Sequence, residues 1–262
     1  MPIIEITDKD RVAALLEHDP LRHLEAIDEN ALGVDGIVSV FCEDVPVPPS
    51  RLVVRWAQGS LGLRSILHVD AGTLSGLSDV VDALPDERAQ YDALVPFFAS
   101  PALGASFQSE VMGASALYTL DPQRLVASPV VQHAQRVTDM ELVKPMFRKL
   151  ADDAPAYALP LRNQIAAVAV VTHLRSSVAR VQVYTVEEAR KRGFGRGVLT
   201  ALCEELLAMH ITPTARVELS DEPSVRLVEG IGFTIADAQL SARLTRRSSV
   251  GGAGGLVQLG GR

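Results

Sequence analysis

A glycine- and arginine-rich turn at residues 183–199, VYTVEEARKRGFGRGVL, holds the residue types best suited to binding a phosphate. Glycines such as Gly193 and Gly195 let the backbone pass close to a ligand with its N–H groups turned outward. The start of a following helix adds partial positive charge, and nearby cationic side chains add full charges. The cationic side chains of this turn are Arg190, Lys191, Arg192 and Arg196. The run therefore predicts a phosphate cradle.

The residues on either side of the turn have the patterns of a strand and a helix. Before the turn, apolar and small residues at 181, 183 and 185 alternate with Arg180, Gln182 and Tyr184, as in a strand. After it, apolar residues form two adjacent i,i+4 rows on one face of a helix: Val198, Leu202 and Leu206, and Leu199, Cys203 and Leu207. The glycines by themselves also fit a tight strand-to-helix connection with no ligand.

Two other phosphate-binding loops do not match. No Lys-Ser or Lys-Thr pair closes the turn, as a nucleoside-triphosphate loop requires. The dinucleotide fingerprint G-x-G-x-x-G is also unmatched. The run Gly193, Gly195, Gly197 lacks its third glycine, because Val198 stands where that glycine would follow Gly193 and Gly195.

Arg190, Gly193 and Gly195 resemble the acyl-CoA pyrophosphate loop of the GNAT superfamily of N-acetyltransferases. The wider run is similar to the branch whose signature reads roughly V-Y-T-P-P-E-Y-R-G-R-G-Y-A. The resemblance implies that loop N–H groups hold the pyrophosphate of acetyl-CoA or another acyl-CoA, and that the preceding strand pairs with pantetheine. The cofactor-binding residues it implies are Val183, Tyr184, Thr185, Arg190, Lys191, Arg192, Gly193, Phe194, Gly195 and Arg196.

A second motif follows a helix and a strand later, in the order that the resemblance requires. The family pattern N-x-x-A-x-x-L-Y-x-x-x-G-F is matched by Leu227, Gly232 and Phe233. Glu222 stands in the asparagine position and Val228 in the tyrosine position. Core packing of the apolar residues is the alternative reading of this segment. Two motifs in the right order favour the family reading.

The resemblance implies direct attack of an amine on the thioester in a ternary complex. The amine must arrive neutral, although the pKa of a lysine-like amine is about 10.4. Val228 has no proton to give to the leaving thiolate, so other residues have to manage proton transfer. The candidate catalytic residues are Tyr184, His173 and Glu222. The alternative explanation is strand packing for Tyr184, a surface position at a hairpin end for His173, and a helix N-terminal charge for Glu222.

The resemblance implies an α/β (α+β) fold class. Residues 129–246 are expected to form a GNAT fold, with a mixed central sheet, splayed parallel strands and flanking helices. We expect strands at 130–137, 157–161, 165–174, 179–185, 214–220 and 233–244, and helices at 138–150, from the loop to about 210, and at 224–230.

Residues 1–128 form an α/β N-terminal half with expected helices at 8–18 and 21–32 and strands at 36–41, 51–56 and 62–69. Helical segments broken at Pro85 are expected at 74–99. This order resembles a degenerate GNAT-like domain without a cofactor loop, although a helix followed by a strand meander is also common elsewhere. We expect this half to supply acceptor-binding elements. The glycine-rich segment 247–262 predicts a flexible tail.

Composition limits the function classes. Hydrophobic residues make up 47% of the 262, and the net charge of −7 argues against a nucleic-acid surface. The longest apolar run, 165–171, is far short of the roughly 20 residues that span a bilayer. Two cysteines and an N-terminus without signal-peptide features predict a cytoplasmic protein. No metal site is predicted.

The hypothesis is therefore an N-acyltransferase acting on a small-molecule or peptide amine, and the resemblance leaves a homodimer open. The alternative is a non-catalytic acyl-CoA-binding sensor or interaction module on the same fold. Transfer to an oxygen acceptor, or thioester hydrolysis, is a third possibility. Steady release of CoA in the presence of an amine separates the enzyme from the sensor.

Overall fold

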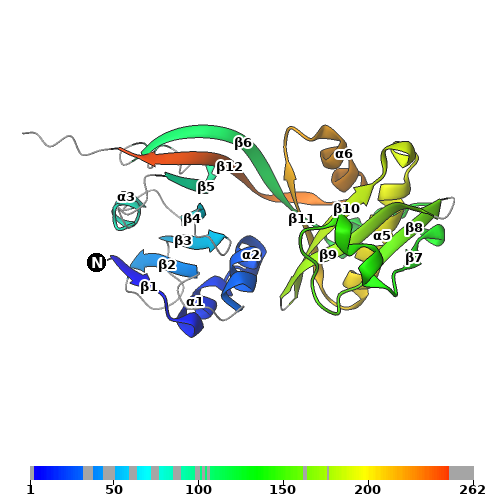
Figure 1. Ribbon diagram of the computed structural model, residues 1–262, viewed down its shortest axis with the longest axis horizontal. Coiled ribbons are helices and arrows are strands. Elements are labelled where there is room, and N and C mark those ends of the chain that lie inside the picture. Colours follow the sequence, from blue (N-terminus) through cyan, green and yellow to red (C-terminus); the bar gives the residue numbers. More distant parts are fainter. Residues whose placement is uncertain are drawn as a thin grey trace, which may run out of the picture.

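A computed structural model of the chain describes residues 3–31, 38–43, 51–58, 64–71, 77–84, 90–97, 101, 104, 107–161, 164–175 and 177–247. Its main feature is one mixed sheet, with helices packed against it (Figure 1). The described helices are α1 (Lys9–Leu16), α2 (Pro20–Ala31), α3 (Leu77–Asp82), α5 (Phe194–Ala208) and α6 (Glu222–Ile231).

The sheet runs in the order β1-β2-β3-β4-β5-β12-β6-β11-β10-β9-β8-β7. The strands of the N-terminal half are β1 (Ile3–Ile6), β2 (Val38–Glu43), β3 (Arg51–Gln58), β4 (Arg64–Ala71), β5 (Gln90–Pro96) and β6 (Phe107–Thr119). Those of the C-terminal half are β7 (Gln135–Arg136), β8 (Ala156–Leu161), β9 (Gln164–Arg175), β10 (Val178–Thr185), β11 (Thr212–Glu218) and β12 (Thr234–Arg246).

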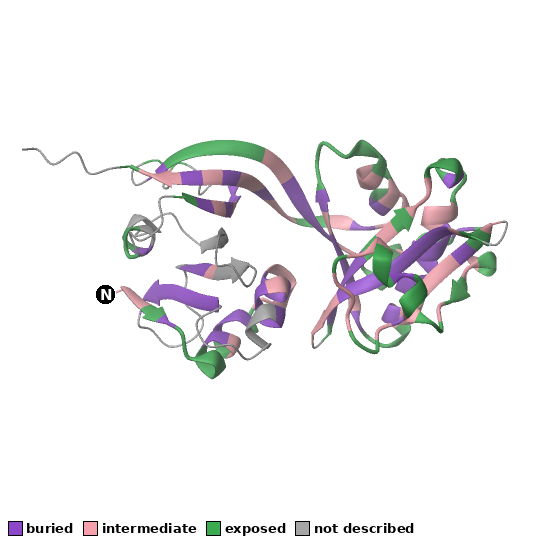
Figure 2. Ribbon diagram, viewed as in Figure 1, coloured by how far each residue is buried: buried purple, intermediate pink, exposed green. Residues whose placement is uncertain are grey.

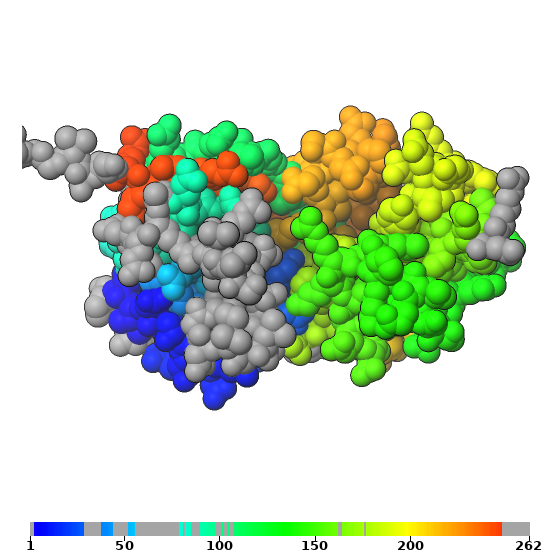
Figure 3. Space-filling view, viewed as in Figure 1, coloured from blue at the N-terminus to red at the C-terminus, as the bar shows by residue number. Residues whose placement is uncertain are grey.

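Two long strands at the centre of the sheet, β6 and β12, join the halves, because each of them pairs with strands of the other half. They pair antiparallel from Phe107↔Arg246 to Thr119↔Thr234, and they arch across both halves in Figure 1. On its other edge β12 pairs with β5 of the N-terminal half, while β6 pairs with β11 of the C-terminal half. Figure 3 shows β12, in orange-red, on the surface of the N-terminal half. Each half therefore completes its sheet with a strand from the other.

The order of the remaining elements repeats between the halves. An antiparallel meander leads into a parallel pair in each, β4 with β5 and β10 with β11. A helix connects the two strands of each pair, α3 in the first half and α5 in the second. That the N-terminal half is a degenerate GNAT-like domain, with a boundary at residue 129, stays a prediction.

Most expected elements of the C-terminal half are confirmed. The hairpin, the strand before the loop, the long helix, the next strand, the short helix and the last strand all lie close to their expected bounds. Helix α5 buries its apolar rows against the sheet, and Figure 2 shows this core as buried strands beneath the helix. Cys203 lies in this core, and burial raises the pKa of its thiol.

Two predictions for residues 130–150 were wrong. The expected strand at 130–137 is a 3₁₀ turn (Val131–His133) followed by the two-residue β7. The expected helix at 138–150 is two 3₁₀ turns, Met140–Leu142 and Lys144–Met146. Asp139 does accept a hydrogen bond from the Glu141 N–H at 3.0 Å. However, Pro145 has no N–H to continue an α-helical ladder.

In the N-terminal half, α3 is confirmed as helical, but residues 90–96 form β5 instead of a helix. Tyr91, Ala93 and Val95 are buried alternately, which is the two-residue period of a strand. The sequence reading also missed β6. Residues 248–262 of the predicted tail, and residues 162–163 between two of the predicted strands, lie outside the described residues. Among the described helices, none is long and apolar enough to cross a membrane.

Candidate active site

The parallel strands β10 and β11 separate part-way along their length. They pair at Val178↔Thr212, Ala179↔Pro213 and Arg180↔Thr214. Beyond that point β11 pairs with β6 and β10 pairs with β9. The backbone of residues 181–185 therefore has an edge that no strand of the described sheet covers. This splay confirms the expected opening in the sheet.

A first pocket of about 750 Å³ lies where β10 ends and α5 begins. Nine of the ten predicted cofactor-binding residues line it, and Arg192 does not. The loop and the strand contribute Val183, Tyr184, Thr185, Ala189, Arg190, Lys191, Gly193, Phe194, Gly195 and Arg196, and α6 with its cap contributes Asp221, Pro223, Ser224, Arg226 and Leu227.

The start of α5 presents backbone donors to this pocket. Gly193 caps the helix at φ 79°, a left-handed conformation that favours glycine. The first helical hydrogen bond runs from the Gly197 N–H to the Gly193 carbonyl at 2.9 Å. The N–H groups of residues 194–196 precede this ladder and have no partner within the helix, and the helix dipole adds partial positive charge beside them.

Gly195 brings the helix start against β10. A Cβ atom at this position would lie 2.8 Å from the Thr185 Oγ1 atom, closer than real Cβ contacts allow. Any other residue here would therefore require the Thr185 side chain or the start of α5 to shift.

The cationic side chains of the loop do not all point into the pocket. The Arg196 Nη2 atom donates to the Gly230 carbonyl at 2.7 Å, which ties α5 to α6. The Arg192 guanidinium lies 4.8 Å from the centre of the Phe194 ring. Arg190 and Lys191 line the pocket, and so does Arg226 of α6, which pairs with Glu222 at 3.2 Å. The sequence reading missed Arg226, whose one signal is its position one helical turn after Glu222.

Two of the proposed proton-transfer positions belong to this region. Tyr184 lines the pocket, and of the four tyrosines it alone does so. Glu222 is an exposed residue in the first turn of α6 and lines neither this pocket nor the cavity on the other face of the sheet. Its position fits the helix N-terminal charge that was its structural alternative. Val228 is 3% exposed and packs in the core beneath α6.

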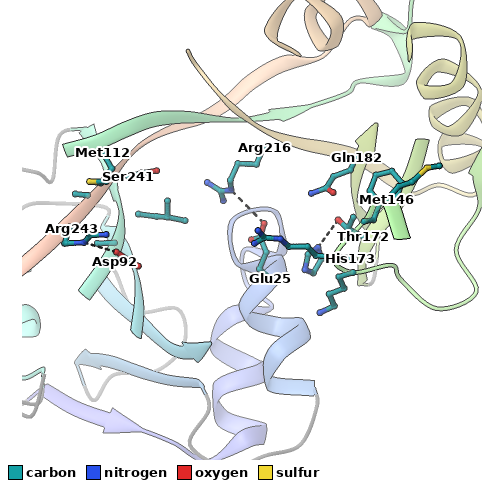
Figure 4. A pocket seen from close by; sticks show the side chains of 16 residues that line it. Glu25, Asp92, Met112, Met146, Thr172, His173, Gln182, Arg216, Ser241 and Arg243 are labelled. Atoms are coloured by element: carbon teal, nitrogen blue, oxygen red, sulfur yellow. Dashed lines mark hydrogen bonds and ion pairs between the residues drawn. The ribbon is translucent and has the colours of Figure 1, made fainter. Parts of the chain in front are cut away.

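A second cavity, of about 780 Å³, lies on the other face of the sheet and is lined by both halves (Figure 4). On β10, Gln182 faces this cavity, while its neighbour Val183 faces the first pocket. The other lining residues are Glu25, Asp92, Ala93, Leu94, Met112, Met146, Phe147, Arg148, Lys149, Thr172, His173, Arg216, Ser241, Ala242 and Arg243.

Glu25 of α2 is the carboxylate at the centre of this cavity. Its Oε1 atom lies 3.3 Å from Arg180 Nη2 and 3.8 Å from Arg216 Nε. Burial raises the pKa of Glu25, but Arg180 and then Arg216 outweigh burial and lower it to about 2. The sequence placed Arg180 correctly on β10 but could not reveal its burial, because α2 of the other half covers it.

His173, predicted as a candidate, also lines this second cavity. Its Nδ1 atom lies 3.0 Å from the Thr172 hydroxyl, whose proton is donated to the Arg180 carbonyl at 3.3 Å. The hydroxyl oxygen therefore accepts from Nδ1–H, which leaves the lone pair on Nε2. Burial lowers the pKa of His173, with Glu25 opposing, so the imidazole is neutral at pH 7.

Comparisons with known proteins agree with this geometry. Residues 160–242, which include the splay and both motifs, match the family model described as FR47-like protein. A GCN5-related N-acetyltransferase from Sphaerobacter thermophilus superposes with a TM-score of 0.60 at 11% identity, over 94% of this chain and 96% of that chain. The fold is a GNAT fold.

Two further structures extend the likeness of the GNAT fold over both halves. A GNAT-family acetyltransferase from Colwellia psychrerythraea gives a TM-score of 0.57 at 12% identity, over 94% of this chain and 100% of that one. A tandem GNAT protein from the clavulanic acid biosynthesis pathway gives a TM-score of 0.57 at 12% identity, over 93% of this chain and 98% of that chain. A search of curated proteins by sequence found no significant match. The described residues hold no cluster of three or more His, Cys, Asp or Glu side chains suited to a metal.

Proposed function

We propose that this protein transfers an acetyl or other short acyl group from acyl-CoA to an amine. The observation that carries the proposal is that one cavity lies on each face of the sheet at the splayed end of β10. Val183, Tyr184 and Thr185 line one and Gln182 lines the other. An acyl thioester entering from the loop side reaches an acceptor on the opposite face at this opening.

The first pocket fits the phosphates of CoA. The N–H groups of residues 194–196 and the side chains of Arg190, Lys191 and Arg226 supply the donors and positive charges that a pyrophosphate needs. The uncovered edge of residues 181–185 offers backbone hydrogen bonds to the pantetheine amides, in the manner of an added strand.

His173 is the best-placed base for the acceptor. Its neutral imidazole, with the lone pair on Nε2, takes a proton from the acceptor ammonium. The amine nitrogen then forms a bond to the thioester carbon, and the carbon–sulfur bond breaks. The nitrogen loses a second proton, and the CoA thiolate gains one. Cytoplasmic location and use of acetyl-CoA in particular remain part of this proposal.

The leaving thiolate does not require a strong acid. Val228 is buried in the core, so no proton comes from that position. A thiol of this kind has a pKa of about 8.5, by analogy with cysteine, so the thiolate leaves readily and takes its proton from Tyr184 or solvent.

The test is a thiol-release assay with acetyl-CoA and a panel of amines, combined with mass spectrometry of the products. We expect CoA release that depends on an amine and an N-acetylated product of matching mass. Tight acetyl-CoA binding without release would instead make the protein a sensor. Release without an N-acetylated product would indicate hydrolysis or an oxygen acceptor.

A further inference from the structure

Arg216 and Gln182 face each other across the opening of the sheet. Arg180↔Thr214 is the last pair between β10 and β11, so Gln182 and Arg216 are the next positions on the same face. Both side chains line the second cavity, as Figure 4 shows. Any acceptor that reaches the opening from this side passes between them.

One edge of the Arg216 guanidinium makes a hydrogen bond, and the other makes none with the described residues. Its Nη1 atom donates to Gln239 Oε1 at 2.7 Å. Its Nε and Nη2 atoms are buried and have no hydrogen-bond partner in the described part of the chain. Glu25 Oε1 lies 3.8 Å from Nε, which is beyond hydrogen-bond reach. Nε–H and Nη2–H point the same way and form the fork that binds a carboxylate through two parallel bonds.

The charges around Arg216 favour an anion at this fork. Arg180 and Arg216 share one carboxylate, Glu25. Arg180 is 3% exposed, and three of its nitrogen atoms lack hydrogen-bond partners among the described residues. The next carboxylate on α2, Asp28, is already paired with Arg175 at 2.8 Å and Lys149 at 3.5 Å.

The far wall of the cavity does not supply the missing charge either. Asp92 of β5 pairs with Arg243 at 3.6 Å. Among the described residues, the site around Glu25 therefore holds two guanidiniums for one carboxylate, and a ligand carboxylate would restore the balance.

We propose that the acceptor is an amino acid or a similar amine that carries a carboxylate, and that its carboxylate binds the Nε–Nη2 edge of Arg216. The proposal rests on the proposed function and names the acceptor class of the same site. The amine of this ligand faces the opening beside Gln182, where its nitrogen attacks the thioester as described above.

Binding to the complex with CoA tests the carboxylate site without requiring turnover. Calorimetry would compare the common L-amino acids with their carboxamides, which keep the amine and lose the negative charge. We expect at least one amino acid to bind at least about tenfold more tightly than its carboxamide, as a charge-assisted bidentate contact implies. Equal affinity of every acid and its amide, or no binding by any acid, would overturn the proposal.

Variants then identify the residue. Arg216→Gln should remove the preference for the acid, and Arg216→Lys, which keeps the charge but not the fork, should retain only part of it. Arg243→Gln, in the same cavity but paired with Asp92, is the control and should keep the preference. If Arg216→Gln does not fold, Arg216→Lys carries the test. Equal weakening of acid and amide by Arg216→Lys would show a structural role and overturn the proposal.

Turnover separates the two proposals. Selective binding of acids that depends on Arg216, without acyl transfer to any amine, would reject the enzyme and keep the carboxylate site. Acyl transfer to amines and to carboxamides as fast as to amino acids would keep the enzyme and reject the carboxylate site.

Discussion

Arg180 of β10 and Glu25 of α2 form an ion pair between the two halves of the chain, with Nη2 3.3 Å from Oε1. Arg180 is buried at the last residue pair before β10 and β11 separate. The N-terminal half therefore contacts the sheet next to the opening that the proposed reaction uses. In the proposed reaction, this contact is the route by which a half without a cofactor loop would affect acceptor binding.

Replacing this carboxylate should destabilise the fold. In Glu25→Gln, Arg180 and Arg216 lose the anion they share, and we expect a loss of about 2 kcal/mol or more in the free energy of unfolding, measured by urea denaturation at pH 7. Glu141→Gln is the control, because Glu141 and its partner Lys144 are both exposed and should contribute little.

The same pair predicts a pH dependence. The pKa of Glu25 is lowered in the folded state to about 2, from an ordinary value of 4.5. Its stabilising effect is therefore present above about pH 4.5 and is lost as the pH falls toward 2. The difference in stability between the wild type and Glu25→Gln should shrink over this range. A difference that stays constant down to pH 2 would show that the charge of Glu25 is not responsible.

The cofactor loop should be sensitive to a single methyl group. Gly195→Ala places a Cβ atom against Thr185 Oγ1, which pushes the start of α5 from β10 and should weaken acetyl-CoA binding measured by calorimetry. The double variant Gly195→Ala, Thr185→Ala lacks the obstructing hydroxyl and should regain part of the lost affinity. Gly195→Asp, which also adds a negative charge, should abolish binding.

Gly230→Ala is the matched control for these glycine variants. Gly230 lies in α6, and a Cβ atom there would meet nothing within 4 Å. We expect unchanged acetyl-CoA affinity and equal or slightly greater stability. Unchanged affinity in Gly195→Asp would reject the loop as the cofactor site.

The turn at residues 190–195 and the helix after it could be predicted from the sequence because their information is local. The spacing of Arg190, Gly193 and Gly195 sets the turn, and the apolar rows after it set the helix. The strand Gln90–Pro96 was missed because seven residues with a broken alternation do not separate a short strand from a helix without the neighbours β4 and β12.

The second cavity could not be predicted, for a different reason. Glu25 and Arg216 are far apart in sequence, and each alone is an ordinary charge on a helix or a strand. They meet because β6 and β12 exchange between the halves and α2 packs against β9 and β10, next to β11. His173 was recognised as a candidate from its place near a hairpin end, but its partner Thr172 and its neutral state depend on this burial.

Two loop arginines that look equivalent in the sequence should behave differently. Arg190 lines the cofactor pocket, whereas Arg192 lies over the Phe194 ring outside its lining. Arg190→Ala should weaken acetyl-CoA binding by about three- to tenfold at low salt, with a smaller effect at high salt, because exposed charges are screened. Arg192→Ala should change affinity less. Calorimetry at two salt concentrations checks both, and a larger effect of Arg192→Ala would contradict the assignment.

His173 should set the acid side of the pH–rate profile. Burial lowers its pKa below the usual value near 6.5, so the base is available at pH 7 and is lost as the pH falls through the lowered pKa. In His173→Gln, kcat should fall about a hundredfold at pH 7 and then rise with pH as the acceptor loses its own proton, at about pH 8 for an α-amine.

Thr172→Val provides the companion variant for His173. It removes the hydroxyl that accepts from Nδ1–H and keeps the shape of the buried side chain, so we expect a smaller loss of kcat and a shifted acid limb. Acetyl-CoA affinity should not change in either variant, because neither residue lines the cofactor pocket. If His173→Gln keeps the wild-type profile while remaining folded, the base is not His173, and the acceptor must bind as the free amine.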